Sequence, residues 1–364
     1  MTDRSNSSLL RLLGVLLALT MAAAACSNDS GSSPDAKTAK TSSDEEPALT
    51  ATLNASGATF PQAFYEEVIA AYNEVQPKVT VNYGGGGSGK GRQELQDGVV
   101  DFAGSDGLVK DEDRPKFKGE FLYIPTITAP ITVSYNLADV KDLHLDADTI
   151  AKIFQRQITT WDDPAIKALN TGAKLPSTPI TVVHRSDGSG TTENFTKYLV
   201  AAAPTTWTLK SGSTVEWPTE TQAGNGNQGV ASTVKSTAGA IGYVDLSDAK
   251  ASALQLATLK NAAGKFVAPT PDATSVALEG VTLNPDLSYN PLNAAGEKAY
   301  PIAAPTWILV YKDQTDKAKA DAFKSFITFL LNDGQDLAKN IDYAPLPDSF
   351  RLKALAQLDQ IVVG

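Results

Sequence analysis

The stretch from residue 179 to residue 202 constrains the fold of this chain more than any other. It opens with an apolar, β-branched run at 179–183 (PITVV), which predicts a buried strand. Apolar residues at helical spacing close it, and they predict a helix: Phe195, Tyr198, Leu199 and Ala202. Between the two lies HRSDGSGTT (184–192), which is rich in small and hydroxyl-bearing residues. The stretch therefore predicts a strand, a tight turn and a helix start in direct succession.

The turn in this stretch has the composition of an anion site. Glycines such as Gly188 and Gly190 let the backbone approach a ligand closely, and the free N–H groups of a first helical turn favour negative charge. Ser189 and Thr191 add hydroxyl donors, and the planar guanidinium of Arg185 fits a tetrahedral oxyanion. The alternative is a capped helix after an exposed turn that binds nothing. This stretch alone does not decide between the two.

Three other stretches place small residues and a hydroxyl or carboxylate after a strand: ASGATFP (55–61), GGGGSGKG (84–91) and AGSDG (103–107). In the first, Thr59 suits a helix cap. In the second, Ser88 stands where a helix would begin. The third follows a short strand predicted at 99–102. The chain therefore offers several helix starts or turns that could face one ligand.

The first 50 residues predict export and anchoring. A positively charged start and an apolar run ending at Ala25, too short for a mature membrane span, make residues 1–25 a signal peptide. The run resembles the signal of bacterial lipoproteins, in which Cys26 would be lipidated and become the new N-terminus. An ordinary secretory signal is the alternative. Residues 26–50 are rich in Ser, Asp and Lys and predict a disordered tether. The folded part is therefore expected to be exported and lipid-anchored to the outer face of the cell membrane.

The glycines at 84–91 and 224–229 match motifs of nucleotide-binding loops. Gly91, however, stands where a phosphate-binding loop needs Ser or Thr to hold magnesium. Neither match is specific, and nucleotides are scarce outside the cell. We therefore predict no nucleotide cofactor.

The charge and the cysteine content argue against three further classes of protein: those that bind nucleic acid, those stabilised by disulfides and those that bind metals. The formal net charge is −10, and without residues 1–25 it is 29 − 40 = −11, so no nucleic-acid partner is expected. The single cysteine excludes an internal disulfide, and the two histidines, His144 and His184, provide no metal-ligand spacing. An anion site in such a protein must work through local geometry.

Strands and helices alternate over the rest of the chain, which indicates an α/β fold. The apolar run at 124–133 is expected to cross between two domains. Strands are also predicted at 239–244 and 302–311, and helical stretches at 147–170 and at 317–331.

Seven phrases in order resemble the periplasmic phosphate-binding proteins of the high-affinity phosphate ABC transporter: SGATFPQ (56–62), NYGGGGSGKG (82–91), VDFAGSDG (100–107), TTWDDPAI (159–166), VVHRSDGSGTT (182–192), GAIGYV (239–244) and DYAPLP (342–347). The resemblance runs from about residue 51 to the last residue. It implies a two-lobed, type II Venus-flytrap fold with two crossings between the lobes. Residues 51–126 and 300–364 would form lobe I, and residues 127–299 would form lobe II.

The same resemblance implies that one phosphate lies between the lobes, held by backbone N–H groups, hydroxyls, one arginine and one aspartate. Carried onto this sequence, its ligands are Ala58, Thr59, Phe60, Ser88 and Asp106 from lobe I and Arg185, Ser189, Gly190 and Thr191 from lobe II. Asp187 would pair with Arg185 and fix its orientation.

Asp106 is the unexpected member of this set, since a carboxylate repels an anion. It fits if the ligand oxygen facing it carries a proton, as phosphate does at neutral pH and sulfate does not. On its own residues, the 103–107 turn favours the alternative that Asp106 only caps the turn.

The implied function is capture of phosphate outside the membrane and delivery to the membrane permease, by a monomer with no catalysis, metal or cofactor. A secreted phosphatase is the alternative, but it needs an activated nucleophile or a metal. Strand alternation should turn His184 away from Arg185. A sensor or adhesin is a third interpretation.

Overall fold

The computed structural model describes residues 48–364. The predicted signal peptide, the lipidation site at Cys26 and the tether up to residue 47 lie outside them. The described chain begins by docking onto the fold, because the Leu49 N–H donates to Gln76 Oε1 at 3.0 Å. No helix in the described part is long and apolar enough to cross a membrane.

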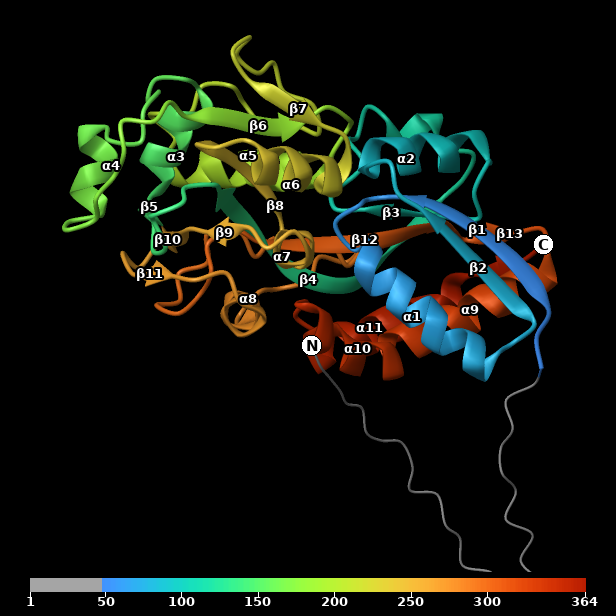
Figure 1. Cartoon of the computed structure of the whole chain (residues 1–364). Helices are drawn as coiled ribbons and strands as arrows, with labels where there is room; N and C mark the ends of the chain where they lie inside the picture. Colours follow the sequence, from blue (N-terminus) through green and yellow to red (C-terminus); the bar gives the residue numbers. More distant parts are fainter. Residues whose placement is uncertain (1–47) are drawn as a thin grey trace, which may run out of the picture. The chain divides into compact units, whose positions relative to one another are not determined.

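A mixed sheet of nine strands runs through this part of the chain (Figure 1). Its order is β2-β1-β3-β12-β4-β8-β6-β7, and β9 also pairs with β4. These strands are β1 (Ala51–Gly57), β2 (Val79–Gly84), β3 (Phe102–Ser105), β4 (Phe121–Tyr135), β6 (Thr181–Arg185), β7 (Gln222–Gly224), β8 (Ala240–Asp245), β9 (Gln255–Leu256) and β12 (Ala303–Tyr311). Five short strands lie outside the sheet: β5 (His144–Leu145), β10 (Thr258–Lys260), β11 (Phe266–Val267), β13 (Asp313–Gln314) and β14 (Val362–Val363).

The long strand β4 joins two halves of this sheet. Its residues 121–130 pair antiparallel with β12, which in turn pairs with β3. Its residues 131–135 pair antiparallel with β8. We call β1, β2 and β3 with their helices the first half, and β6, β7 and β8 with theirs the second half. The apolar run at 124–133, predicted to cross between domains, lies in this shared strand.

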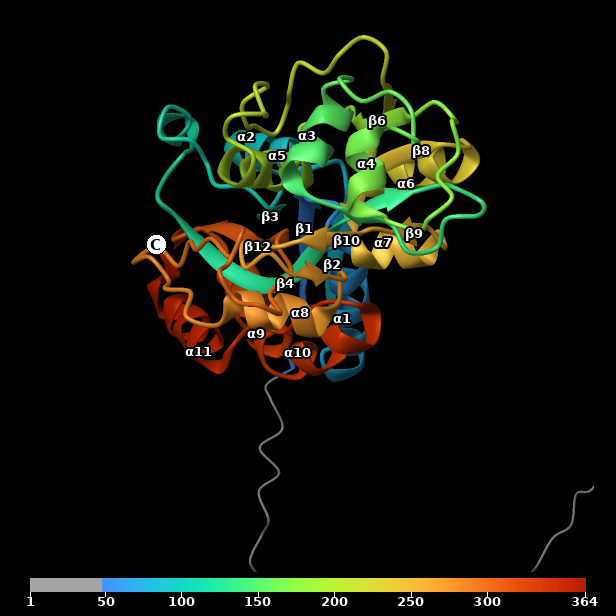
Figure 2. The same ribbon diagram turned by 90° about the vertical axis from the view of Figure 1, so that its left-hand side faces the viewer.

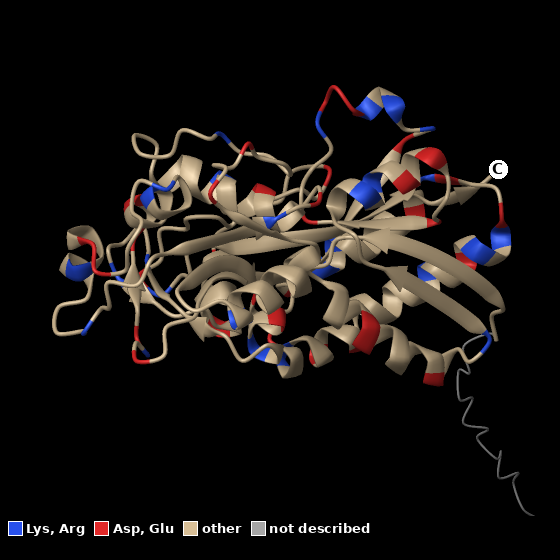
Figure 3. Cartoon of the chain, turned by 45° about the horizontal axis from the view of Figure 1, so that its top comes forward, with Lys and Arg blue, Asp and Glu red and all other residues tan. Residues whose placement is uncertain are grey.

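Helices cover both faces of the sheet, as Figures 1 and 2 show. On the first half, α1 and α9 pack on one face and α2 lies on the other; α5 and α6 flank the second half. The helices are α1 (Gln62–Val75), α2 (Ser88–Asp97), α3 (Ala147–Phe154), α4 (Pro164–Leu169), α5 (Gly190–Ala202), α6 (Gly226–Ser236), α7 (Leu246–Ala251), α8 (Pro271–Leu278), α9 (Lys317–Leu331), α10 (Asp333–Ala338) and α11 (Asp348–Gln357). Short 3₁₀ turns occur at Arg114–Lys116, Lys339–Ile341 and Leu358–Gln360. Charged residues lie mainly on helices and loops around the sheet (Figure 3).

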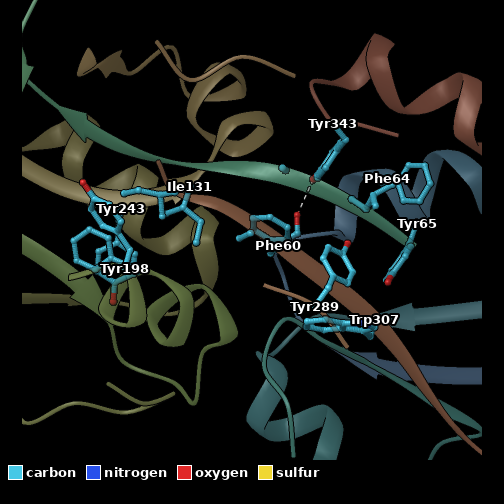
Figure 4. Packing of buried hydrophobic residues seen from close by; sticks show 14 of the residues in the cluster. Phe60, Phe64, Tyr65, Ile131, Tyr198, Tyr243, Tyr289, Trp307 and Tyr343 are labelled. Atoms are coloured by element: carbon cyan, nitrogen blue, oxygen red, sulfur yellow. Dashed lines mark hydrogen bonds between the residues drawn. The ribbon is translucent and has the colours of Figure 1, made fainter. Parts of the chain in front are cut away.

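The core is rich in aromatic side chains on both sides of β4 (Figure 4). In the first half, Phe60 packs edge-on against Tyr343, whose hydroxyl donates to the Phe60 carbonyl oxygen at 2.7 Å. In the second half, the Tyr243 ring stacks on Phe195 with centroids 4.3 Å apart. This packing holds the loop before α1 and the start of α5 against the sheet.

Three predictions of element boundaries were wrong in detail. The strand predicted at 99–102 begins at Phe102 and continues through Ser105, because residues 102–104 pair with β1; Val99 is 65% exposed. The helical stretch 147–170 divides into α3 and α4, and Arg156 with its positive φ of 61° follows the end of α3. Thr59 does not cap α1, which begins at Gln62 with Pro61 at the cap position.

Candidate anion-binding site

The turn predicted to bind an anion connects β6 to α5. β6 ends at Arg185, and α5 begins at Gly190. Ser189 caps the helix, because its Oγ accepts a hydrogen bond from the Thr192 N–H at 3.0 Å. Its own hydroxyl proton remains available to a ligand.

Arg185 is fixed in place by buried partners. Its side chain is 1% exposed. Its Nε donates to Asp187 Oδ1 at 2.8 Å, its Nη2 donates to Asp187 Oδ2, and its Nη1 donates to Asn227 Oδ1 at 2.7 Å. Burial acts to raise the pKa of Asp187, but the hydrogen bonds and charge of Arg185 more than offset it and lower the pKa. The expected pair is therefore present, with Asp187 ionised and the guanidinium oriented.

Asp106 lies on the first half, directly after β3. It is 2% exposed. Its N–H donates to Ser88 Oγ at 3.1 Å, and its Oδ1 accepts from the Thr306 hydroxyl at 2.8 Å. Ser88 Oγ in turn lies 3.4 Å from Asp106 Oδ2. The carboxyl group is thus held between the start of α2 and the middle of β12.

Burial raises the pKa of Asp106 to about 7, even though hydrogen bonds from Thr306 and Ser88 and the charge of Arg185 act to lower it. A carboxyl group with this pKa can accept a proton from a ligand or donate one near neutral pH. This is the type of perturbed group that occurs at functional sites.

The loop before α1 contributes less than the sequence implied. The Ala58 N–H, expected to contact the anion, donates instead to the Gly104 carbonyl oxygen at 2.9 Å, because β1 and β3 are paired beside it. Thr59 Oγ1 accepts from the Asn227 N–H at 3.2 Å, so its hydroxyl proton is free to donate. The role expected of the Ala58 amide is therefore not met in this structure, whereas Thr59 remains suited to its role.

At the predicted ligand positions, five backbone N–H groups have no acceptor among residues 48–364. They belong to Thr59, Phe60, Ser88, Gly190 and Thr191. Phe60, Ser88 and Thr191 are 0% exposed, Gly190 is buried, and Thr59 is 5% exposed. Buried N–H groups are almost always paired. Their concentration at the predicted positions makes this region the candidate site for an acceptor-rich ligand.

Contacts between the halves bring these donors together. The Gly89 N–H donates to the Gly188 carbonyl oxygen at 2.8 Å. Gly190 lies directly against the first half, because a Cβ there would be 2.6 Å from Asp106 Cβ. The structure thus gathers the predicted residues into one set: Thr59, Phe60, Ser88, Asp106, Arg185, Asp187, Ser189, Gly190 and Thr191.

The sequence prediction missed two side chains that hold this set. Asn227 lies in the first turn of α6, within the glycine-rich run 224–229, which is also a strand–turn–helix. Comparing that run with 184–192 could have identified it. Thr306 lies inside β12 and carries no local signal.

His184 packs away from the site, as strand alternation predicted. Its ring stacks on Trp217 with centroids 4.9 Å apart, and its Nε2 is 3.1 Å from the Thr221 hydroxyl. Among residues 48–364, no group of three or more His, Cys, Asp or Glu side chains could hold a metal ion.

A fold of two sheet halves with buried donors between them is that of periplasmic binding proteins, and the sequence matches the PBP superfamily domain over residues 36–334. The chain is 37% identical to the phosphate-binding protein PstS of Methanocaldococcus jannaschii, over 92% of this chain and 90% of the relative. It is 34% identical to the phosphate-binding protein PstS 3 of Mycobacterium tuberculosis, over 96% and 97%. The chain therefore belongs to the PstS family of phosphate-binding proteins.

Solved structures support the same fold. A high-affinity periplasmic phosphate-binding protein (PfluDING) bound with phosphate superimposes with a TM-score of 0.71 at 23% identity, over 84% of this chain and 94% of that one. A phosphate-binding protein from Stenotrophomonas maltophilia gives 0.69 at 19%, over 85% and 94%. The predicted α/β, two-lobed binding-protein fold is confirmed.

The raised pKa of Asp106 predicts a pH effect on the ligand-free protein. Since its folded pKa lies above the value near 3.8 of a free aspartate, Asp106 contributes stability below pH 4 that is lost as pH rises through 7. The free energy of unfolding of Asp106→Asn, relative to the unsubstituted protein, should therefore rise by roughly 2–4 kcal/mol between pH 4 and pH 8. Denaturant titrations at a series of pH values test this. A constant difference would mean that Asp106 titrates normally.

Proposed function

We propose that this protein is an extracytoplasmic receptor that binds inorganic phosphate between its two lobes and delivers it to an ABC permease. The five unpaired, buried N–H groups around Arg185 carry this proposal, because they need an acceptor-rich ligand. A tetrahedral oxyanion offers acceptors in every direction. The phosphate-binding relatives support the choice of phosphate.

The proposed site suits a protein with a net charge of −10. Most of its donors are neutral dipoles: N–H groups at the starts of α2 and α5, and the hydroxyls of Thr59, Ser189 and Thr191. Helix starts and hydroxyls stabilise an anion at short range. Arg185 adds one positive charge, and Asp187 largely neutralises it at longer range. Selection therefore depends on contact geometry rather than on attraction from a distance.

Asp106 would select the protonation state of the ligand. Its carboxylate accepts a hydrogen bond from a protonated phosphate oxygen, whereas sulfate places a lone pair against it. A lost buried hydrogen bond costs about 1–3 kcal/mol, and more where charges meet. Sulfate should therefore bind more weakly than phosphate above pH 7, where the Asp106 carboxyl group is ionised.

The domain and membrane assignments belong to the same proposal. Lobe I would comprise residues 51–126 and 300–364 and lobe II residues 127–299, with β4 and β12 carrying the crossings. Lipid attachment at Cys26 would hold a monomer at the outer face of the membrane, close to the permease. The names of the relatives describe binding proteins, which favours a receptor over the phosphatase alternative.

Removing the one proposed arginine ligand tests the site. Arg185→Ala should weaken phosphate binding by roughly 2–5 kcal/mol, because it removes a desolvated charge and leaves Asp187 buried without its partner. Isothermal titration calorimetry with phosphate measures this. Arg351→Ala on α11 is the matched control and should bind normally. An unchanged dissociation constant for Arg185→Ala would exclude Arg185 as a ligand.

Changing the acceptor at residue 106 tests selectivity. In Asp106→Asn, an amide N–H₂ can turn toward the anion and donate where the carboxylate accepted. Sulfate should then gain affinity relative to phosphate, measured by competition at matched ionic strength and pH 8. Asp111→Asn, on an exposed loop, serves as control.

The pH dependence provides a second test of the same role. Below the Asp106 pKa of about 7, the neutral carboxyl group can itself donate to sulfate. Sulfate affinity of the unsubstituted protein should therefore rise as pH falls from 8 to 5, while that of Asp106→Asn stays nearly constant. If the phosphate-to-sulfate ratio is the same in both proteins at all pH values, Asp106 is a turn residue only.

Anchoring depends on Cys26. Cys26→Ala should remove the lipid attachment point, so that the protein is released from the membrane fraction or remains unprocessed. Labelling cells with radioactive palmitate, followed by precipitation of the protein, measures the modification. Failure of the unsubstituted protein to incorporate label would leave an ordinary secretory signal as the explanation.

A further inference from the structure

One turn into α5 lies a buried asparagine that reaches from the second half to the first. Asn194 is 4% exposed. Its Nδ2 donates to the Asp106 carbonyl oxygen at 2.6 Å and to the Gly190 carbonyl oxygen at 3.0 Å. The first of these bonds joins α5 to the turn after β3, which belongs to the other half of the sheet.

Asn194 is not arranged as a ligand of the anion. Its two hydrogen bonds donate to protein carbonyl oxygens, which occupies the amide protons of Nδ2. The Asp106 side chain is held by other residues, since Thr306 donates to its Oδ1. Asn194 therefore acts on the backbone at residue 106 rather than on its carboxyl group.

The residues around this hydrogen bond are closely packed. Gly107 lies against the Glu193 carboxylate, where a Cβ would collide with Glu193 Oε2. Glu193 is itself held by Lys197 at 2.6 Å. The turn at 106–107 and the first turn of α5 thus form a small interface that separates when the halves separate.

Two other hydrogen bonds close the halves around the site. The Gly89 N–H donates to the Gly188 carbonyl oxygen, and the Asn227 N–H donates to Thr59 Oγ1. Both donors are backbone groups. Of these three bonds, that of Asn194 is the one in which a side chain supplies the donor, so it can be removed without altering a proposed ligand of the anion.

We infer that Asn194 is a positioning residue that latches the two halves in the closed state and thereby sets how long phosphate stays bound. This inference rests on the proposed function. Opening breaks the bond from Nδ2 to the Asp106 carbonyl oxygen, and closure restores it. Asn194 affects the rate at which the anion is released, whereas Asp106 affects which anion binds.

The rate of phosphate release tests the latch. Asn194→Leu keeps the approximate size of the side chain and removes the donor. Phosphate dissociation, followed by rapid filtration with radiolabelled phosphate, should become about tenfold faster or more, as expected for loss of a buried hydrogen bond.

Asn261→Leu is the control: Asn261 is 6% exposed and donates to the carbonyl oxygens of Gly296, Glu297 and Ala299, away from the first half. Its release rate should stay within about twofold of the unsubstituted protein. If Asn194→Leu does not fold, Asn194→Ser is measured instead.

Hydrogen–deuterium exchange of the ligand-free protein gives a readout that does not need phosphate. Asn194→Leu should speed exchange in peptides covering 104–109 and 188–195, and Asn261→Leu should not. If the unsubstituted protein fails to bind phosphate, the proposed function fails, and exchange alone decides the latch. Unchanged exchange in Asn194→Leu, or equal effects in both variants, would overturn the inference. So would unchanged release in a protein that does bind phosphate.

Discussion

Buried N–H groups without an acceptor are costly, and the candidate site, within residues 48–364, gathers five of them from three separate segments. Each unpaired buried donor costs about 1–3 kcal/mol, so the ligand-free closed arrangement carries a penalty that an anion would remove. Ser88, Gly190 and the Thr59–Phe60 loop share this condition although they lie far apart in the sequence. The N–H groups that would bind the anion are therefore the same groups that make the ligand-free fold less stable.

The frame that makes this convergence possible is the shared strand β4. Because it pairs with β12 along one part and with β8 along the other, the sheet continues from one half to the other without a break. The starts of α2 and α5 then meet from opposite halves at Gly89 and Gly188. Figure 4 shows the aromatic side chains that pack on both sides of β4.

Local sequence patterns predicted the elements well and the donors less well. α9 occupies residues 317–331 as predicted, and β6 and α5 surround the predicted turn. Helix periodicity and glycine content are local properties, so they can be recognised in one stretch. Whether an N–H is free depends on pairing between distant segments. The Ala58 N–H pairs with the Gly104 carbonyl oxygen because β1 lies beside β3. The Thr306 hydroxyl donates to Asp106, although the two residues are 200 positions apart in the sequence. No local pattern contains that information.

The close approach of Gly190 to Asp106 has a consequence for what the protein can respond to. With no room for even a Cβ at residue 190, and with Gly89 bonded to Gly188 beside it, the closed halves leave little space for a group attached to a phosphate oxygen. A sugar phosphate or a nucleotide would hold the halves apart. In an environment rich in organic phosphorus, the closed form would therefore respond to free orthophosphate rather than to phosphate esters.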